Sequence, residues 1–296
     1  VLATRQVTGQ EAINQLGSVI AALPIDQANL IHRLLKKTPD CGVMAKTVNS
    51  VWPDLIKSYP CLLAHPYEEK LAKKIDWKAG VYVQLKSDGL RVNILVDDRG
   101  SVTCYTRSGN VLDVHGAFDF VANIAKNVVF DGELLTVNQS TGKFNIRQVS
   151  NGICNKAVRG TLSVEEAETM HAVLWDCIPL SDFKIGKSDK LYKNRFEDLT
   201  SLLNSNTEYS KKVSLIPGKT VGTLEEAVEF FREQLAKGEE GAMIKSALLP
   251  WENKRSKLQL KLKLEAVNEF KVKGFKEGTG KLLGNLGSIE LSLIHI

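Results

Sequence analysis

Apolar and polar residues alternate most regularly over residues 257–264, where every second position is leucine. A period of two is the pattern of a β-strand with one buried face. The leucines are therefore expected to face a core, and the opposite face would carry Lys257, Gln259, Lys261 and Lys263. Residues 81–86 alternate in the same way, with three apolar residues on one face and Tyr82, Gln84 and Lys86 on the other.

Other short apolar runs also predict strands, and each carries a charged or aromatic residue near one end. These runs are 91–96, 128–134, 171–176 and 240–245. The pair Asp88-Gly89 between the first two strands is typical of a tight turn, because glycine tolerates backbone conformations that other residues avoid. Alone, this pair is also typical of an ordinary hairpin end.

Helix start signals occur at both ends of the chain. Thr8 with Glu11, and Thr223 with Glu226, have the spacing of a capping box, and Asp26 is a candidate cap for a second helix. A further helix is expected to start near Ser163, and Gly238 would stop the helix that begins at Thr223. We therefore expect an α+β protein with a helical segment at 1–58, a mixed domain at 59–263 and a basic, strand-forming segment at 264–296.

Composition adds few constraints. The formal net charge is +5 and the isoelectric point about 8.8, which suits a phosphate-binding enzyme and many other proteins. Basic residues outnumber acidic ones between 254 and 281. This pattern is typical of a surface that binds a nucleic-acid backbone, or simply of a solvent-exposed surface. No apolar run reaches the ~18 residues of a membrane span. The five cysteines and five histidines are scattered, so we expect reduced thiols and no histidine-based metal site.

The candidate chemistry centres on Lys86. A free lysine has a pKa of ~10.4 and needs burial or neighbouring cations to act as a nucleophile. Lysines on a strand face can bind a triphosphate, and carboxylates such as Glu133 and Glu240 can hold a divalent metal or a ribose hydroxyl. Each residue alone is typical of a solvated surface. Their joint order along the chain favours transfer of a nucleotidyl group onto a lysine.

With these motifs, the chain resembles the ATP-dependent DNA ligases of the T-even bacteriophage type, which are covalent nucleotidyltransferases. The matching motifs are 86–89, 131–133, 175–176, 240–241 with Lys245, and 261–263. Stretches outside the motifs match as well, at 2–5, 150–156 and 251–257. The resemblance covers the chain from about residue 2 to about residue 275.

The resemblance implies an antiparallel-sheet nucleotidyltransferase (adenylation) domain at 59–263. The C-terminal part of a helical DNA-binding domain would precede it at 1–58, and the start of an OB-fold would follow at 264–296. It also implies that Lys86 takes AMP from ATP. The AMP would then pass to the 5′-phosphate of nicked double-stranded DNA, which the 3′-hydroxyl seals during replication, repair and recombination.

The resemblance assigns roles to individual residues. Trp175 would pack on adenine, Gln84 would lie beside the adenine edge, and Leu85 would also belong to the cofactor site. Arg91 and Arg107 would contact the ribose and the phosphates of the nick or the nucleotide. Glu133 would take a ribose hydroxyl or Mg²⁺. The remaining assignments are Glu240 for the metal and Lys245, Lys261 and Lys263 for phosphates.

Alternatives remain at this level. An RNA ligase, a capping-type nucleotidyltransferase and an NAD-dependent ligase share the lysine motif, and a non-catalytic nucleic-acid-binding fragment is a further interpretation. A P-loop is disfavoured because Lys281 is followed by Leu282 and not by Ser or Thr. The chain starts at Val1 and lacks the family's sixth motif, so we expect a partial sequence that adenylylates slowly on its own. We expect a monomer in the cytoplasm of a phage-infected bacterium.

Overall fold

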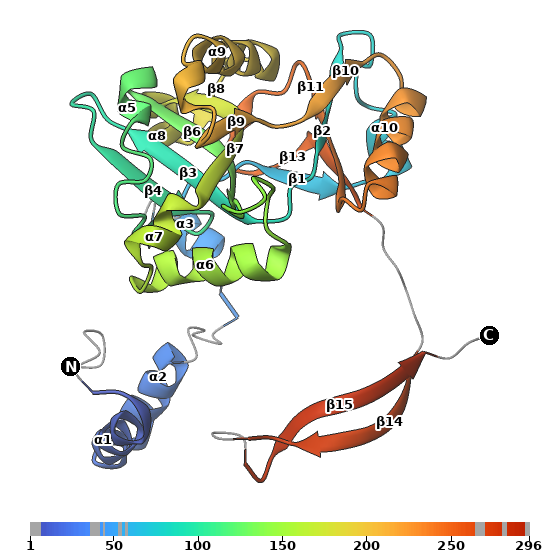
Figure 1. Cartoon of the computed structure of the whole chain (residues 1–296). Helices are drawn as coiled ribbons and strands as arrows, with labels where there is room; N and C mark the ends of the chain where they lie inside the picture. Colours follow the sequence, from blue (N-terminus) through green and yellow to red (C-terminus); the bar gives the residue numbers. More distant parts are fainter. Residues whose placement is uncertain are drawn as a thin grey trace. The chain divides into compact units, whose positions relative to one another are not determined.

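The computed structural model describes residues 7–35, 42–43, 45–52, 55–56, 59–263, 270–279 and 283–293. The chain divides into two compact units, Val1–Ser58 and Tyr59–Ile296 (Figure 1). The stretch 2–5, which carries part of the family resemblance, lies outside the described residues. Cys41 does so too, and the four described cysteines are free thiols.

The first unit is helical. It contains α1 (Gly9–Ala21), α2 (Ile25–Leu35) and α3 (Ala45–Val51). Neither α1 nor α2 contains a buried residue. Thr8 occupies the predicted N-cap position of α1, but its side chain makes no capping hydrogen bond. Asp26 is not a cap, since it lies inside the first turn of α2. The helices themselves form as their apolar spacing predicts.

The second unit is built on two main sheets. The smaller has the strand order β1-β13-β11-β2-β10, and the larger has the order β5-β4-β3-β6-β7-β9. Their strands are β1 (Leu63–Pro66), β2 (Val81–Leu85), β3 (Leu90–Val96), β4 (Val102–Thr106), β5 (Val111–Leu112), β6 (Val128–Thr136), β7 (Met170–Pro179), β9 (Val213–Leu215), β10 (Gly218–Val221), β11 (Gly241–Ser246) and β13 (Arg255–Lys263). Both sheets are mainly antiparallel, as predicted, with parallel pairs β1/β13 and β7/β9.

Two small elements pair separately. The strands β8 (Lys187–Ser188) and β12 (Trp251–Glu252) form one two-stranded sheet. The strands β14 (Phe270–Glu277) and β15 (Leu286–Leu293) form another, with antiparallel register. The basic segment therefore forms strands, as its alternation indicates. Its assignment to an OB-fold stays a prediction.

Helices pack on the two main sheets (Figure 1). They are α4 (Glu69–Ala72), α5 (Val121–Ile124), α6 (Arg147–Arg159), α7 (Val164–Glu168), α8 (Leu180–Ile185), the 3-10 helix η1 (Thr207–Tyr209), α9 (Tyr192–Asn204) and α10 (Leu224–Ala236). The caps predicted at Ser163 and Thr223 are confirmed, since each side chain accepts a hydrogen bond from the backbone N–H three residues later. Gly238 follows α10 with a positive φ of 82°.

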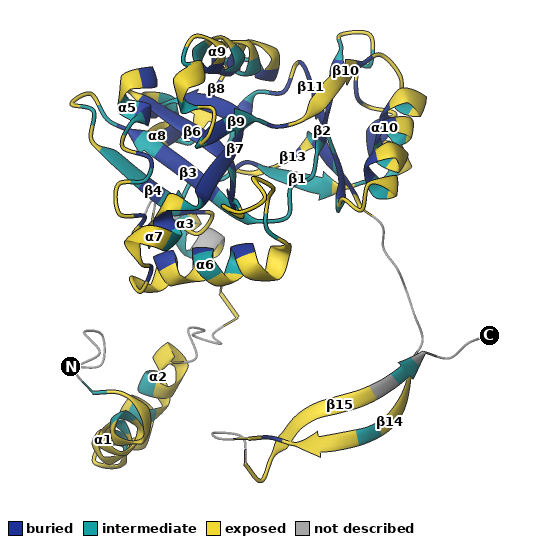
Figure 2. Cartoon of the chain, viewed as in Figure 1, coloured by how far each residue is buried: buried dark blue, intermediate teal, exposed yellow. Residues whose placement is uncertain are grey.

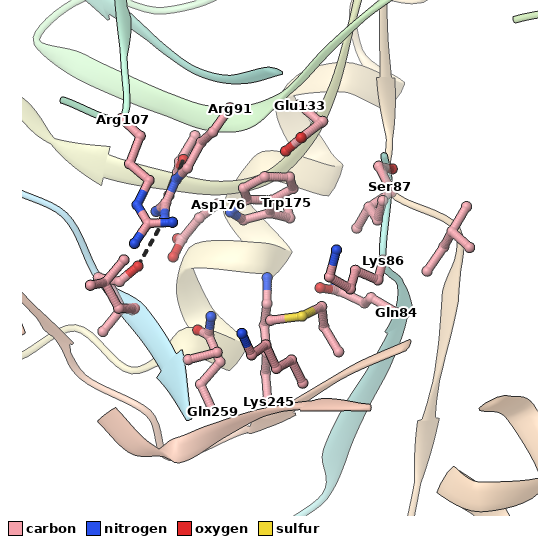
Figure 3. A pocket seen from close by; sticks show the side chains of 18 of the residues that line it. Gln84, Lys86, Ser87, Arg91, Arg107, Glu133, Trp175, Asp176, Lys245 and Gln259 are labelled. Atoms are coloured by element: carbon pink, nitrogen blue, oxygen red, sulfur yellow. Dashed lines mark hydrogen bonds and ion pairs between the residues drawn. The ribbon is translucent and has the colours of Figure 1, made fainter. Parts of the chain in front are cut away.

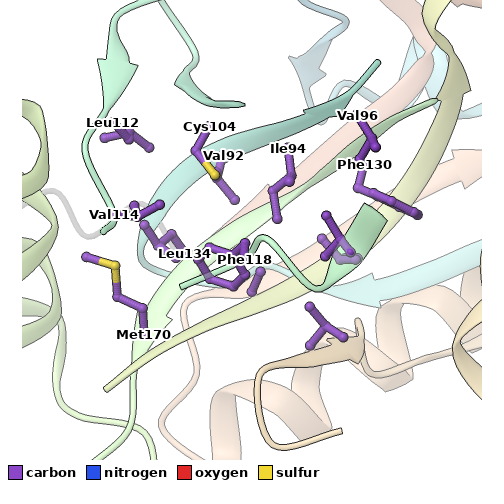
Figure 4. Packing of buried hydrophobic residues seen from close by; sticks show 14 of the residues in the cluster. Val92, Ile94, Val96, Cys104, Leu112, Val114, Phe118, Phe130, Leu134 and Met170 are labelled. Carbon is purple, nitrogen blue, oxygen red and sulfur yellow. The ribbon is translucent and has the colours of Figure 1, made fainter. Parts of the chain in front are cut away.

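Each sheet has its own hydrophobic core. Valine, isoleucine and phenylalanine side chains of β3 and β6 pack with residues of α6 and α9 on one face of the larger sheet (Figure 4). On the smaller sheet, Val81 and Val83 pack with Phe230 of α10, and Leu260 and Leu262 of the leucine-rich strand join them. These buried residues appear dark blue in Figure 2. Most described apolar residues of the two alternating runs therefore face a core, as predicted; Leu85 is half-buried and lines a cavity, and Leu264 lies outside the described residues.

The segment after Lys86 does not form a hairpin. Strand β2 pairs with β10 and β11, whereas β3 pairs with β4 and β6, so residues 86–89 cross from one sheet to the other. A side-chain carbon at Gly89 would lie 2.5 Å from the Leu134 carbonyl oxygen of β6. Glycine is required here because the crossing chain packs directly against a strand. The alternative interpretation of Asp88-Gly89 as an ordinary hairpin end is therefore excluded.

Candidate functional site

A cavity of about 430 Å³ opens between the two main sheets (Figure 3). The smaller sheet contributes Gln84 from β2, Met243 and Lys245 from β11, and Gln259 and Lys261 from β13. The larger sheet contributes Arg91 from β3, Asp131 and Glu133 from β6, and Trp175 and Asp176 from β7. Lys86 lies on the crossing segment between the sheets, so its amine borders a pocket with cationic, carboxylate and aromatic walls.

Lys86 is held by a carboxylate that directly precedes the neighbouring strand β11. Its Nζ forms an ion pair with Glu240, and its backbone N–H donates to the Gly241 carbonyl oxygen at 3.0 Å. The two side chains of the pair are 23% and 28% exposed, and Lys86 lines the cavity. The amine is therefore fixed in position while still reachable by a ligand.

Trp175 and Asp176 both line the cavity although they are neighbours in one strand. Alternation would put them on opposite faces, but the register of β6 against β7 shifts here: Asp131 pairs with Asp176 and Gly132 with Leu174. Trp175 is the extra residue of this bulge, and bulges re-aim side chains. A side-chain carbon at Gly132 would lie 2.5 Å from the Val173 carbonyl oxygen, which explains the glycine between the two acids of β6.

Glu133 accepts a hydrogen bond of 3.1 Å from the Gly89 N–H. It thereby links the larger sheet to the segment that carries Lys86. Burial raises the pKa of Glu133 to about 7, while the Gly89 hydrogen bond and nearby Arg91 act in the opposite direction. Near neutral pH this carboxyl group therefore exchanges readily between its acid and its base form.

Arg91 is bound chiefly to Asp131. Its Nε and Nη2 donate to the two carboxylate oxygens at 2.9 and 2.6 Å, and its Nη1 donates to the Leu62 carbonyl oxygen at 2.9 Å. Asn93 donates to the same carboxylate at 2.9 Å. The guanidinium still lines the cavity and lies 5.7 Å from the Trp175 ring centre. Its position is thus set before any ligand arrives.

Lys245 lies deep in the cavity wall and is 4% exposed. Its Nζ is 3.2 Å from the Tyr192 hydroxyl, 4.7 Å from the Tyr192 ring centre and 5.2 Å from the Trp175 ring centre. Burial lowers its pKa to about 7. The aromatic contacts place this amine at the Trp175 end of the cavity.

Gln84 leaves one end of its amide without a partner beside the cavity. Tyr192 Oη lies 3.0 Å from Gln84 Oε1 and 2.8 Å from the Trp175 carbonyl oxygen, and the buried Gln84 Nε2 has no partner among the described residues. A hydroxyl carries one hydrogen and cannot donate to both oxygens. If the amide is turned by half a rotation, Nε2 donates to Tyr192, Tyr192 donates to Trp175, and Oε1 becomes the free atom. This orientation gives a hydrogen-bond partner to Gln84 Nε2, to the Tyr192 hydroxyl and to the Trp175 carbonyl oxygen.

The structure gathers most of the residues predicted from the motifs. The predicted residues that line the cavity are Gln84, Leu85, Lys86, Arg91, Arg107, Glu133, Trp175, Lys245 and Lys261. Glu240 reaches the site through its ion pair with Lys86. Lys263 is exposed and does not line the cavity, because the sheet carries the end of β13 past the pocket.

Several residues of the site were not predicted from the sequence. Tyr192 and Arg195 come from α9, and the fully buried Arg195 holds Asp176 through hydrogen bonds of 2.8 and 3.0 Å. The sequence contains one signal for Arg195. Arg195, Leu199 and Leu203 follow one another at intervals of four residues, so this arginine lies on the apolar face of an amphipathic helix. Such an arginine requires a buried acid.

Replacing Glu133 by glutamine tests its titration. The native carboxyl binds protons more tightly than an unfolded one, so its contribution to stability falls as pH rises from about 4.5 to about 7. We expect Glu133→Gln to stabilise the fold by on the order of 1–3 kcal/mol at pH 8 and by little at pH 5. Urea unfolding at both pH values measures this. An equal effect at pH 5 and pH 8 would contradict the assignment.

No helix among the described residues is both long and apolar enough to cross a membrane. No group of three or more histidine, cysteine, aspartate or glutamate side chains is arranged there to hold a metal ion by itself.

Comparison with known proteins gives a consistent result. Residues 61–263 match the family model of the ATP dependent DNA ligase domain. The chain is 30% identical to the DNA ligase of Enterobacteria phage T4 and 31% identical to that of phage T6, over 92% of this chain in both cases. It spans 62% of the length of each of these curated relatives.

Solved structures share the fold. The structure named Pmar-Lig_PreS3 aligns with a TM-score of 0.72 at 22% identity, over 97% of this chain and 67% of that one. The ATP-dependent DNA ligase from bacteriophage T7 in complex with ATP aligns with a TM-score of 0.56 at 18% identity, over 79% and 80%. The family model covers more than half of the chain, and the arrangement of two sheets around a lysine-bearing cavity agrees with it. The chain belongs to the ATP-dependent DNA ligase family.

Proposed function

We propose that this protein is an ATP-dependent DNA ligase that works through a lysyl-AMP intermediate on Lys86. The observation that carries the proposal is the position of the Lys86 amine. It borders a cavity that also holds an aromatic ring, an amide and several cations. Nucleotidyl transfer needs a positioned amine, a base-binding surface and preset positive charge around the phosphates.

The cavity suits adenine at its Trp175 end. The indole ring offers a stacking surface, and Gln84 Oε1 in its satisfied orientation can accept a hydrogen bond from the adenine amino group. Guanine presents a carbonyl oxygen at the corresponding position, which would leave two acceptors facing each other. We therefore expect ATP to be preferred over GTP.

The chain's own groups supply the chemistry of the first step. The Lys86 ammonium must lose a proton before it attacks, and the Glu240 carboxylate in contact with it can accept that proton. The amine then forms a bond to the α-phosphorus, and the bond to pyrophosphate breaks. Arg107, Arg255 and Lys261 line the cavity and can stabilise the charge that develops on the phosphoryl oxygens.

Mg²⁺ fits the carboxylates present. This ion commonly takes one or two protein carboxylates and completes its shell with substrate phosphates and water. Glu133 lines the cavity and is the residue we propose to hold it, whereas Glu240, the second carboxylate predicted for the metal, is taken as the proton acceptor of Lys86. When bound, Mg²⁺ would neutralise phosphate charge.

We further propose that the adenylyl group passes to the 5′-phosphate of nicked duplex DNA, and that the 3′-hydroxyl displaces AMP to seal the strand. The similarity to two phage DNA ligases supports this substrate and a place of action in the infected bacterial cell. The chain spans 62% of the length of these relatives, so the sealing steps are proposed for the whole protein.

Intact-mass measurement tests the first step. The chain is incubated with Mg²⁺ and ATP, GTP or NAD, and we expect the mass of one adenylyl group to be gained with ATP alone. Because the adduct is covalent, a slow reaction still accumulates product. Preference for GTP would favour a capping-type nucleotidyltransferase, and preference for NAD would point to the other ligase class.

A further inference from the structure

Helix α6 has an unusual sequence for a helix. Its central residues, 150–155, include serine, cysteine, two asparagines and a glycine, all of which are weak helix formers. Gly152 is exposed, and a side-chain carbon there would meet nothing within 4 Å. Its φ is not positive, so neither packing nor backbone conformation within the described chain requires glycine. A position that breaks the local rule without an internal reason is often functional.

The exposed surface of α6 carries a polar stripe, beside which Val149 and Val158 are also exposed. Its central stripe has helical spacing of four, three and four residues. The residues of the stripe are Gln148, Gly152, Asn155 and Arg159, and all are exposed. The opposite face packs into the core through Cys154 and Ala157. Figure 2 shows the helix as mostly exposed, with a few buried residues between. The stripe therefore offers hydrogen-bonding groups and a bare stretch of backbone to the outside.

The segment that contains α6 has basic side chains and no acidic ones of its own. Residues 134–164 contain Lys143, Arg147, Lys156 and Arg159 and no aspartate or glutamate. Lys156 pairs with Glu166, whereas Lys143 and Arg159 make no ion pair within the part of the chain that the structure describes. Unpaired cations beside amide side chains match a phosphodiester backbone, which presents negative oxygens at regular intervals.

The helix is tied to the candidate site at its first turn. Arg147 Nη1 lies 3.1 Å from Asp88 Oδ1, two residues beyond Lys86. Ser150 Oγ lies 3.0 Å from Thr136 Oγ1, at the end of the strand that carries Glu133. A polymer bound along α6 would thus pass close to the segment that bears the reactive amine.

From these observations we propose that the α6 stripe binds the sugar-phosphate backbone of duplex DNA beside the nick. The inference rests on the proposed ligase function and adds a contact surface to it. Arg159 contacts a phosphate, and Gln148 and Asn155 donate hydrogen bonds to the backbone. Gly152 lets the DNA strand approach the helix closely, as glycine does at other close contacts. The contact reads no sequence.

The test measures binding of the 296-residue chain to a nicked duplex by fluorescence anisotropy at several salt concentrations. Gly152→Gln should raise Tm by roughly 2 °C, because glutamine favours helix. The same change should weaken DNA binding by about 5- to 10-fold, because it blocks close approach. Arg159→Gln should lower the salt dependence by about one phosphate contact. ATP-dependent adduct formation on Lys86 should not change in either variant.

Matched controls lie on other helices. Ser201→Gln on α9 and Arg232→Gln on α10 alter exposed positions in the same way and should leave DNA binding unchanged. A more stable Gly152→Gln protein with wild-type DNA affinity would overturn the inference. So would a wild-type chain that forms the AMP adduct without binding duplex DNA, or one that prefers duplex RNA. Failure of adduct formation with ATP would instead count against the proposed function.

Discussion

Replacing Lys86 by alanine is expected to abolish the covalent AMP adduct. Among the described lysines that line the cavity, Lys86 is the one that lies on the crossing segment and against a carboxylate able to accept its proton. Loss of a covalent nucleophile in other enzymes lowers the rate by ~10³-fold or more, so the adduct should fall below detection by intact mass. ATP binding should persist within several-fold, since the base-binding wall is untouched, and calorimetry measures this.

Lys86→Arg is the matched control for charge. It keeps a cation beside Glu240, but a guanidinium cannot be deprotonated in a protein and cannot attack phosphorus. We expect it to be as inactive as the alanine variant. An arginine variant that still forms the adduct would show that another amine is the nucleophile.

Replacing Arg195 by leucine is expected to destabilise the fold strongly. Arg195 and Asp176 are both almost fully buried, and removal of one partner leaves an uncompensated charge. Such a change costs about 3–5 kcal/mol. For a domain of this size, Tm should fall by roughly 10 °C, as scanning calorimetry would show.

Lys190→Gln is the control for this prediction, because Lys190 forms an exposed ion pair with Asp198 close by in the chain. Exposed pairs contribute about 1 kcal/mol or less. Removing both buried charges, with Arg195→Leu and Asp176→Leu together, should recover much of the stability. Equal destabilisation by Arg195→Leu and Lys190→Gln would refute the role given to the buried pair.

Sequence patterns predicted the parts of the fold that depend on local periodicity. The described part of the alternating run, residues 257–263, lies in strand β13, and Leu260 and Leu262 face the core as expected. The helix capped by Thr223 also forms where its signals indicate. These features succeed because a buried face and a helix cap are encoded within a few neighbouring residues.

Features that depend on distant partners were not predictable in this way. A glycine after an aspartate looks the same whether it makes a hairpin or packs against another strand, so the crossing at Gly89 was missed. The bulge at Trp175 reverses the expected facing of Asp176, and nothing in the strand's own sequence reveals the extra residue. The motif resemblance found most of the cavity's lining because it carries information about such distant contacts. It could not reveal Tyr192, which contacts Gln84 of strand β2 from helix α9.

The division of the cavity between two sheets has a mechanical consequence. Lys86, Lys245 and Lys261 belong to the smaller sheet or its edge, whereas Glu133, Arg91 and Trp175 belong to the larger, and each sheet has its own core. A nucleotide that binds both sheets would couple two separately packed layers. Backbone amides of both sheets should then gain protection from hydrogen exchange together when the nucleotide binds. A substitution that weakens nucleotide contacts in one sheet should reduce this protection in the other sheet as well.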